Sequence, residues 1–199
     1  MDFPVFKCFI DESIDSEFQV DFISLVDKPA ILKNFIAFSE NEKLKFSIDT
    51  EKRVVSGPAM LADIGIYRND SVMGEYYAVF DKETILSIVQ KFFKKDFHKN
   101  INLMHDPESK TSGVTVYESF LVDRARGIMP MKGYEDAADG SWFVSQKVDD
   151  DAIWAKVKSG EIKGFSVEGI FKQVQVKPQK MSAEVALEKI KVLLSMISE

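Results

Sequence analysis

The sequence has little of several features that would indicate common classes of function. It contains one cysteine, Cys8, among 199 residues, so no disulfide can form within the chain, which fits a reducing cytoplasm. No stretch approaches the ~20 apolar residues of a membrane span. The formal net charge is −6 and no basic cluster stands out, which argues against nucleic acid as the main ligand. We therefore expect a cytoplasmic protein without a membrane or nucleic-acid partner.

Patterns for metals and cofactors are also missing. One cysteine and two histidines, His98 and His105, do not give the ligand spacing of a zinc site. The acidic segments 133–140 and 149–151 lack the alternating oxygen ligands of a calcium loop, and a loop and a helix start explain them more simply. Cys8 itself lies in an apolar strand pattern and is expected to be a core residue rather than a nucleophile. We expect neither a metal nor a cofactor.

What the sequence does have is short apolar runs between turn residues, in an ordinary globular composition of 45% hydrophobic and 29% charged residues. Such runs are typical of β-strands. The Gly57-Pro58 pair inside one of them indicates a bulge or bend. The predicted strands are Val5–Ile10, Phe18–Val26, Asn34–Phe38, Val54–Ile66, Ile101–Met104, Gly113–Val122, Trp142–Lys147 and Ile162–Val176, with a further short strand inside 39–51.

Two segments have the pattern of α-helices instead. Residues 81–97 begin with a candidate N-cap, Asp81, and repeat apolar residues at helical spacing. Residues 149–159 begin with three aspartates, which suit the positive end of a helix dipole, and stop at Gly160. Strands still dominate, so the pattern favours an α+β fold in which helices surround a barrel-like sheet.

The end of the chain differs in character. Residues 177–180 have the composition of a linker, and Ser182 is a candidate N-cap for an amphipathic helix from Ala183 onward. We predict one domain over residues 1–176, followed by a linker and a C-terminal amphipathic helix over residues 177–199. The apolar stripe of this helix is compatible with packing on its own domain and equally with binding a partner or a second copy.

Two residues have settings that suit a catalytic site. His105 ends an apolar strand pattern at a turn, which places an imidazole at an edge of the sheet. Ser166 lies between Gly164 and Gly169, and glycines there let another backbone or a substrate come close. Strand alternation puts Ser166 and Glu168 on one face. Taken alone, a histidine in such a setting is more often structural, and the two glycines around Ser166 are also explained by a strand bulge.

Taken in their order along the chain, these pieces resemble a known family, the phage prohead proteases. Residues 103–106 (LMHD), followed by 113–120 (GVTVYESF), are similar to the histidine strand and hairpin of those enzymes. Residues 142–144 (WFV) and 151–169, which contain W-x-x-V-K-x-G-E-I-x-G-F-S, complete the pattern. The match is best with the XkdF-type branch and covers roughly residues 54–172.

The resemblance extends to residues 22–30 (FISLVDKPA), which are similar to a strand that follows the serine in the wider family. Here this strand precedes the histidine, as in the XkdF-type branch, which is the order of a circular permutation. The resemblance implies the fold of the herpesvirus assemblin proteases in permuted form. That fold is a closed antiparallel β-barrel of about seven strands surrounded by helices.

The resemblance also implies catalytic roles. Ser166 would attack the scissile carbonyl of a protein substrate, and His105 would take the proton and return it to the leaving amine. Backbone N–H groups or an arginine would stabilise the developing oxyanion, and Arg124 and Arg126 are the candidate arginines. In this interpretation the protein is a serine endopeptidase.

The third catalytic residue is the point at which the sequence departs from the family pattern. Relatives carry an acid or a histidine at the position of Phe22, and a phenylalanine cannot orient an imidazole. Asp21 is our first candidate for this role, although strand alternation turns it to the other face unless a bulge shifts the register. Glu168 is the second candidate, and a bare Ser–His dyad is the remaining alternative.

The family further implies phage scaffold and major capsid proteins as substrates, in the host cytoplasm inside the assembling prohead. The fold relatives suggest a homodimer. The main alternative is a non-catalytic head-assembly protein that retains the protease fold, and Phe22 favours it. A general β-rich binding module is a third interpretation. An enzyme requires the side chains of His105 and Ser166 to lie within about 3–4 Å of each other.

Overall fold

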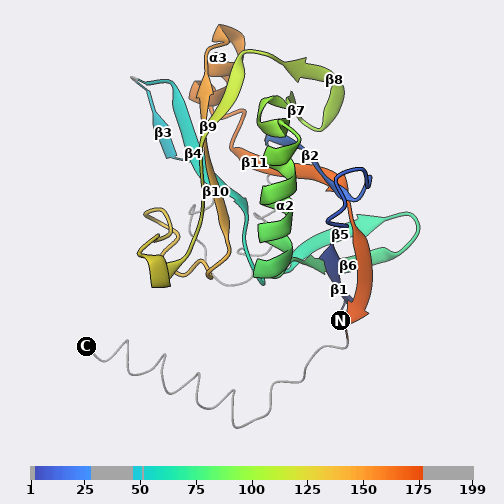
Figure 1. Ribbon diagram of the computed structural model, residues 1–199. Coiled ribbons are helices and arrows are strands. Elements are labelled where there is room, and N and C mark those ends of the chain that lie inside the picture. The colour runs from blue at the N-terminus through green and yellow to red at the C-terminus, as the bar shows by residue number, and fades with distance from the viewer. Residues whose placement is uncertain (1–2, 28–46, 51, 177–199) are drawn as a thin grey trace.

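The computed structural model describes residues 3–27, 47–50 and 52–176, and β-strands dominate this part of the chain (Figure 1). Its strands form three separate four-stranded sheets. Two α-helices accompany them, α2 (Lys82–Lys94) and α3 (Asp151–Ser159), together with two short 3-10 helices, η1 (Phe97–Lys99) and η2 (Arg124–Arg126). In Figure 1, α2 runs through the middle of the molecule in front of β11, and α3 lies at one end.

The strand order of the first sheet is β12-β1-β6-β5, that of the second is β3-β4-β10-β9, and that of the third is β11-β2-β7-β8. The strands are β1 (Val5–Phe9), β2 (Gln19–Val26), β3 (Ser47–Asp49), β4 (Val54–Met60), β5 (Ile66–Asp70), β6 (Gly74–Val79), β7 (Ile101–Leu103), β8 (Asp106–Thr111), β9 (Val114–Leu121), β10 (Trp142–Val148), β11 (Gly164–Ile170) and β12 (Lys172–Val176).

The predicted closed antiparallel barrel of about seven strands surrounded by helices is wrong. In a closed barrel every strand has a neighbour on both sides. Within the described residues each sheet instead has two open edges, formed by β12 and β5, by β3 and β9, and by β11 and β8. Two pairs, β1 with β6 and β2 with β7, are parallel, which an antiparallel barrel excludes. The sheets are held together by a shared apolar core, which includes Leu25, Trp142 and Phe165.

Both predicted helices are present, and local chemistry sets their ends. The side chain of Asp81 caps α2 by accepting a hydrogen bond from the backbone N–H of Thr84 at 2.9 Å. Asp150 caps α3 in the same way, and Gly160 ends it in the left-handed conformation with φ of 75°. The buried face of α2 includes Phe92, whose ring meets Trp142 edge-to-face at 5.4 Å between centroids.

A buried lysine of α2 holds the loop that leads into β2. Lys91 is 3% exposed, and its Nζ donates to the backbone carbonyls of Asp11 and Ser16 at 2.9 Å and of Phe18 at 3.2 Å. Three oxygens around one ammonium satisfy all of its donors, which is the condition under which a lysine can be buried. The loop and α2 are therefore fixed to each other, and β2 begins at a defined point.

Some predicted segments cannot be compared with the structure, and some observed strands were not predicted. The strand predicted at Asn34–Phe38, most of 39–51, and the linker and helix at 177–199 lie outside the described residues. The β5–β6 hairpin and the polar strand β8 were not predicted. None of the helices in the described ranges has the length and the apolar character needed to cross a membrane.

Candidate active site

Polar side chains gather on one face of the third sheet. Ser24 on β2 lies opposite Ser166 on β11 in the antiparallel register, and Phe22 lies opposite Glu168. Residues that face each other across two strands project from the same side of the sheet. Ser24 is fully buried and Ser166 is 4% exposed, whereas the Glu168 side chain is 25% exposed. On this face both serines are therefore shielded from solvent, whereas the carboxylate is partly exposed.

His105 reaches this face from the tip of the β7–β8 hairpin. Leu103 pairs with Asp106, so Met104 and His105 form a two-residue turn, and their φ angles are 54° and 61°. Two successive left-handed residues define a type I′ turn, for which asparagine and glycine are the preferred residues. A left-handed non-glycine residue costs about 1–2 kcal/mol. The hairpin thus keeps two strained residues at the position that orients the imidazole.

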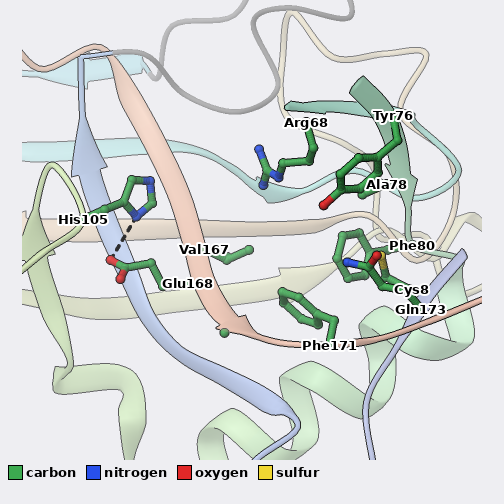
Figure 2. A pocket seen from close by; sticks show the side chains of 11 residues that line it. Cys8, Arg68, Tyr76, Ala78, Phe80, His105, Val167, Glu168, Phe171 and Gln173 are labelled. Carbon is green, nitrogen blue, oxygen red and sulfur yellow. Dashed lines mark ion pairs between the residues drawn. The ribbon is translucent and has the colours of Figure 1, made fainter. Parts of the chain in front are cut away.

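The imidazole of His105 has two partners, and both contact the same nitrogen. Its Nδ1 lies 3.0 Å from Oε1 of Glu168 and 3.2 Å from Oγ of Ser24. The hydroxyl of Ser24 donates to the Glu168 carboxylate, so the Ser24 oxygen is left to accept from Nδ1. This hydrogen-bond network requires the proton on Nδ1. Nε2 then carries the lone pair, and Figure 2 shows it pointing away from Glu168.

Glu168 contacts the other polar side chains of this cluster, Ser24, Asn102 and His105. Its Oε1 also accepts a hydrogen bond from Nδ2 of Asn102 at 2.7 Å, and Asn102 is fully buried on β7. Burial is the largest single influence and disfavours ionisation. The hydrogen bonds from Ser24, Asn102 and His105, with the attraction of His105, outweigh it and hold the pKa of Glu168 below its ordinary value. The group is therefore a carboxylate at neutral pH.

The structure brings His105 and Ser166 to the same face without a direct hydrogen bond. Within the described residues, the hydroxyl bound to the imidazole is that of Ser24. Ser166 is the cross-strand neighbour of Ser24, so their Cβ atoms are about 5 Å apart. Catalytic hydrogen bonds in an unliganded site are often longer than in the reacting complex.

Asp21 lies at an irregular point of β2. The register with β11 shifts between Glu168 and Gly169, which makes Asp21 the additional residue of β2 at a bulge. Its carboxylate accepts a hydrogen bond from Nε2 of Gln19 at 2.7 Å, whereas the carboxylate that contacts His105 belongs to Glu168. The bulge that could turn Asp21 toward the histidine is present, but Asp21 accepts its hydrogen bonds from Gln19 and Asn100.

A pocket of about 420 Å³ opens beside the cluster (Figure 2). His105, Glu168 and Val167 line it on one side, and Arg68 and Tyr76 of the first sheet line it on the other. Its volume is in the ordinary range of ligand pockets, about 300–1,000 Å³. The pocket therefore joins the imidazole to a surface built from a different sheet.

The two arginines predicted as candidates for the oxyanion are engaged elsewhere. Arg124 pairs with Asp139 and also donates to backbone carbonyls, and Arg126 pairs with Asp123. The arginine that shares a pocket with His105 is Arg68. In the described ranges no group of three or more histidine, cysteine, aspartate or glutamate side chains is arranged to hold a metal ion.

Sequence reasoning gave no role to Ser24, Asn102 or Arg68. Ser24 and Asn102 are single polar residues inside apolar strand patterns, and that was the available signal, because a buried polar side chain requires a partner. Arg68 lies in a polar hairpin and had no such signal.

Comparison with known proteins tests the family resemblance predicted from the sequence. No curated protein and no solved structure matches the chain. A family model described as "Putative phage serine protease XkdF" matches residues 45–175, well over half of the chain. The matched range contains His105, Ser166 and Glu168, and it confirms the resemblance predicted from the sequence. The chain belongs to the family of phage serine proteases that this model describes.

Proposed function

We propose that the protein is a serine endopeptidase in which Ser166 is the nucleophile, His105 the general base and Glu168 the carboxylate that orients the imidazole. The observation that carries this proposal is the 3.0 Å contact between Nδ1 of His105 and Glu168, which leaves Nε2 without a hydrogen bond to any described residue, at a face that also bears Ser166. An imidazole that acts as a general base needs one ring nitrogen held by a hydrogen-bond partner and the other open to the nucleophile.

Ser24 is a positioning residue in this scheme. Its oxygen lies on the Nδ1 side of the ring and its proton is donated to Glu168, so Nε2 cannot deprotonate it. Ser166 is its cross-strand neighbour and is the remaining hydroxyl that β11 and β2 place together on this face.

The chemical steps follow from these positions. Oγ of Ser166 attacks the scissile carbonyl as its proton passes to Nε2 of His105, and the ionised Glu168 stabilises the imidazolium that forms. Nε2–H then protonates the leaving amine, and the peptide C–N bond breaks to give an ester on Ser166. Water, deprotonated by Nε2, hydrolyses that ester and releases Ser166.

The third role is assigned to Glu168 rather than to Asp21. Glu168 contacts the imidazole and is ionised, whereas the Asp21 carboxylate accepts from Gln19. Glu168 therefore also weakens the alternative of a non-catalytic head-assembly protein. That alternative drew on Phe22, and the acid that Phe22 replaces is supplied here from the facing strand.

The substrates that fit a phage serine protease of this family are phage proteins. We propose the scaffold and major capsid proteins of the assembling prohead, cut in the host cytoplasm, with the enzyme acting there as a homodimer. Family membership supports the phage setting. The scaffold and capsid substrates and the dimer are proposed from the resemblance noted in the sequence.

The experiment compares the wild type with Ser166→Ala, Ser24→Ala and a control on α2 outside the cluster, the half-buried Ser87→Ala, each co-expressed with the phage scaffold and capsid proteins. Product masses report cleavage, and a fluorophosphonate probe followed by peptide mapping reports the reactive serine. We expect cleavage and labelling at Ser166, lost in Ser166→Ala and retained in Ser87→Ala. Cleavage that survives Ser166→Ala would assign a different nucleophile. Neither cleavage nor labelling in the wild type would favour the non-catalytic protein.

A further inference from the structure

Arg68 lines the pocket beside His105 and has no ion-pair partner among the described residues. All four arginines of the sequence lie in the described ranges, and three of them form ion pairs there. Arg68 forms none with a described residue. Figure 2 shows its guanidinium directed into the pocket, together with the hydroxyl end of Tyr76.

The surroundings of Arg68 do not compensate its charge. The pocket wall around it includes Cys8, Tyr76 and Phe80, and burial lowers the pKa of the guanidinium in spite of the opposing influence of Tyr76 and Cys8. Glu168 is the carboxylate that lines the pocket, and it already interacts with Ser24, Asn102 and His105. A partly buried guanidinium without a partner costs folding free energy, and such a group is typical of a site whose partner arrives with a ligand.

We propose that this pocket is a specificity subsite for an acidic side chain of the substrate, a glutamate or aspartate close to the scissile bond, recognised by Arg68. The inference rests on the proposed function and names a feature of its substrate. A peptide bound at His105 can place a side chain in this pocket, because one cavity is lined by His105, by Val167 and Gly169 of β11, and by Arg68.

A carboxylate suits the subsite for two reasons. The guanidinium offers a planar fork of donors that matches a carboxylate with two parallel hydrogen bonds. Tyr76, which faces Arg68 across the β5–β6 register, directs its hydroxyl into the same space. A lysine side chain of a substrate would instead meet uncompensated positive charge and be rejected.

The cleavage test uses the full chain and a proteome-derived peptide library, with cleaved positions identified by mass spectrometry. In the wild type we expect glutamate and aspartate to be enriched at one subsite by about 10- to 100-fold in kcat/KM over glutamine, the range of a hydrogen bond to a charged group. Arg68→Met should abolish the enrichment and Arg68→Glu should replace it with lysine and arginine. The control Arg126→Met should keep the acidic preference.

Two results of this test would overturn the subsite while leaving the protease intact. One is cleavage by the wild type without an acidic preference at any position. The other is an acidic preference that persists in Arg68→Met while all peptides slow by the same factor. That second pattern would assign Arg68 to the oxyanion instead, since an oxyanion donor acts on every substrate alike.

A binding test separates the subsite from catalysis. N-acetyl-glutamate methylamide and its glutamine counterpart are titrated into the Ser166→Ala protein, and the NMR signals of the arginine Nε–Hε groups are followed. We expect a saturable shift of the Arg68 signal with the glutamate compound alone, and its loss in Arg68→Met, with thermal unfolding confirming that both proteins are folded. Equal shifts with both compounds, or none with either, would overturn the inference whether or not the protein cleaves peptides.

Discussion

Glu168 of β11 lies directly opposite Phe22 of β2, and its carboxylate contacts the imidazole of His105. The resemblance noted from the sequence implies an acid or a histidine at the position of Phe22, on β2. Facing residues of an antiparallel pair project from the same side with Cβ atoms about 5 Å apart, so an acid on either strand can reach the same imidazole. The carboxylate that contacts His105 in this chain therefore comes from the strand next to β2, which is the basis of the role proposed for Glu168.

Exchanging the acid between the two strands tests this relationship. Glu168→Gln should lower kcat/KM by about 100-fold or more, because the imidazolium loses its counter-charge. The double variant Phe22→Glu/Glu168→Gln should regain at least about tenfold, and Phe22→Gln/Glu168→Gln is the matched control without the acid. Full activity of Glu168→Gln, measured by steady-state kinetics on a cleaved peptide, would contradict the assignment.

The same carboxylate should make folding stability depend on pH. The pKa of Glu168 is held below its ordinary value, so the unfolded chain binds the proton more readily than the folded one. Its contribution is therefore present above about pH 4.3, the ordinary glutamate pKa, and is lost as the pH falls through the folded value.

Urea unfolding of the wild type and of Glu168→Gln, measured from neutral pH to about pH 3, checks the sign. We expect the difference in unfolding free energy between the two proteins to be constant near neutrality and to shrink below the ordinary glutamate range. A difference that grows on acidification would contradict the network around Glu168.

The turn that carries His105 predicts an unusual response to glycine. Met104 has φ of 54°, and a glycine there removes the left-handed strain while it adds chain entropy to the unfolded state. Met104→Gly should therefore stabilise the protein by about 0.5–1 kcal/mol, and Met104→Val should destabilise it by about 1 kcal/mol. Met129, an exposed methionine without a positive φ, is the control, and Met129→Gly should give no stabilisation in the same denaturant titration.

Gly169 predicts the opposite response. A Cβ built there would lie 2.0 Å from the backbone oxygen of Gln19, so β2 and β11 approach too closely for any side chain. Gly169→Ala should cost about 2–3 kcal/mol and displace Glu168 next to it, so that activity falls as well. At Gly65 the nearest atom is 3.4 Å away, and Gly65→Ala should cost much less. Equal thermal stability of the two variants would contradict the close approach.

Structural features that depend on local chemistry, such as helix ends and turns, could be predicted from the sequence. Asp81 and Gly160 set helix ends within one turn, and His105 was placed at a turn after a strand. Strand partners depend instead on contacts between distant segments, which apolar alternation does not specify. The parallel pairing of β2 with β7, and hence the open sheets, could not be derived from it. The strand β8 has almost no apolar residues and left no pattern to detect.

The site was predictable to a similar degree. His105, Ser166 and the candidate Glu168 came from motif order and strand alternation, and the structure places all three on or beside one face. The preference for Asp21 over Glu168 came from treating β2 alone. The cross-strand register, which puts Glu168 opposite Phe22, is a tertiary property that a single strand does not contain.

The order of the third sheet, β11-β2-β7-β8, has a consequence for the newly made protein. The cluster takes Ser24 from the first strand to leave the ribosome on this sheet, Asn102 and His105 from the middle of the chain, and Ser166 and Glu168 from near residue 170. During synthesis β2 is complete long before β11, so the cluster cannot form until both strands have been made. In the proposed protease, cleavage would therefore begin only after nearly the whole described chain has been synthesised.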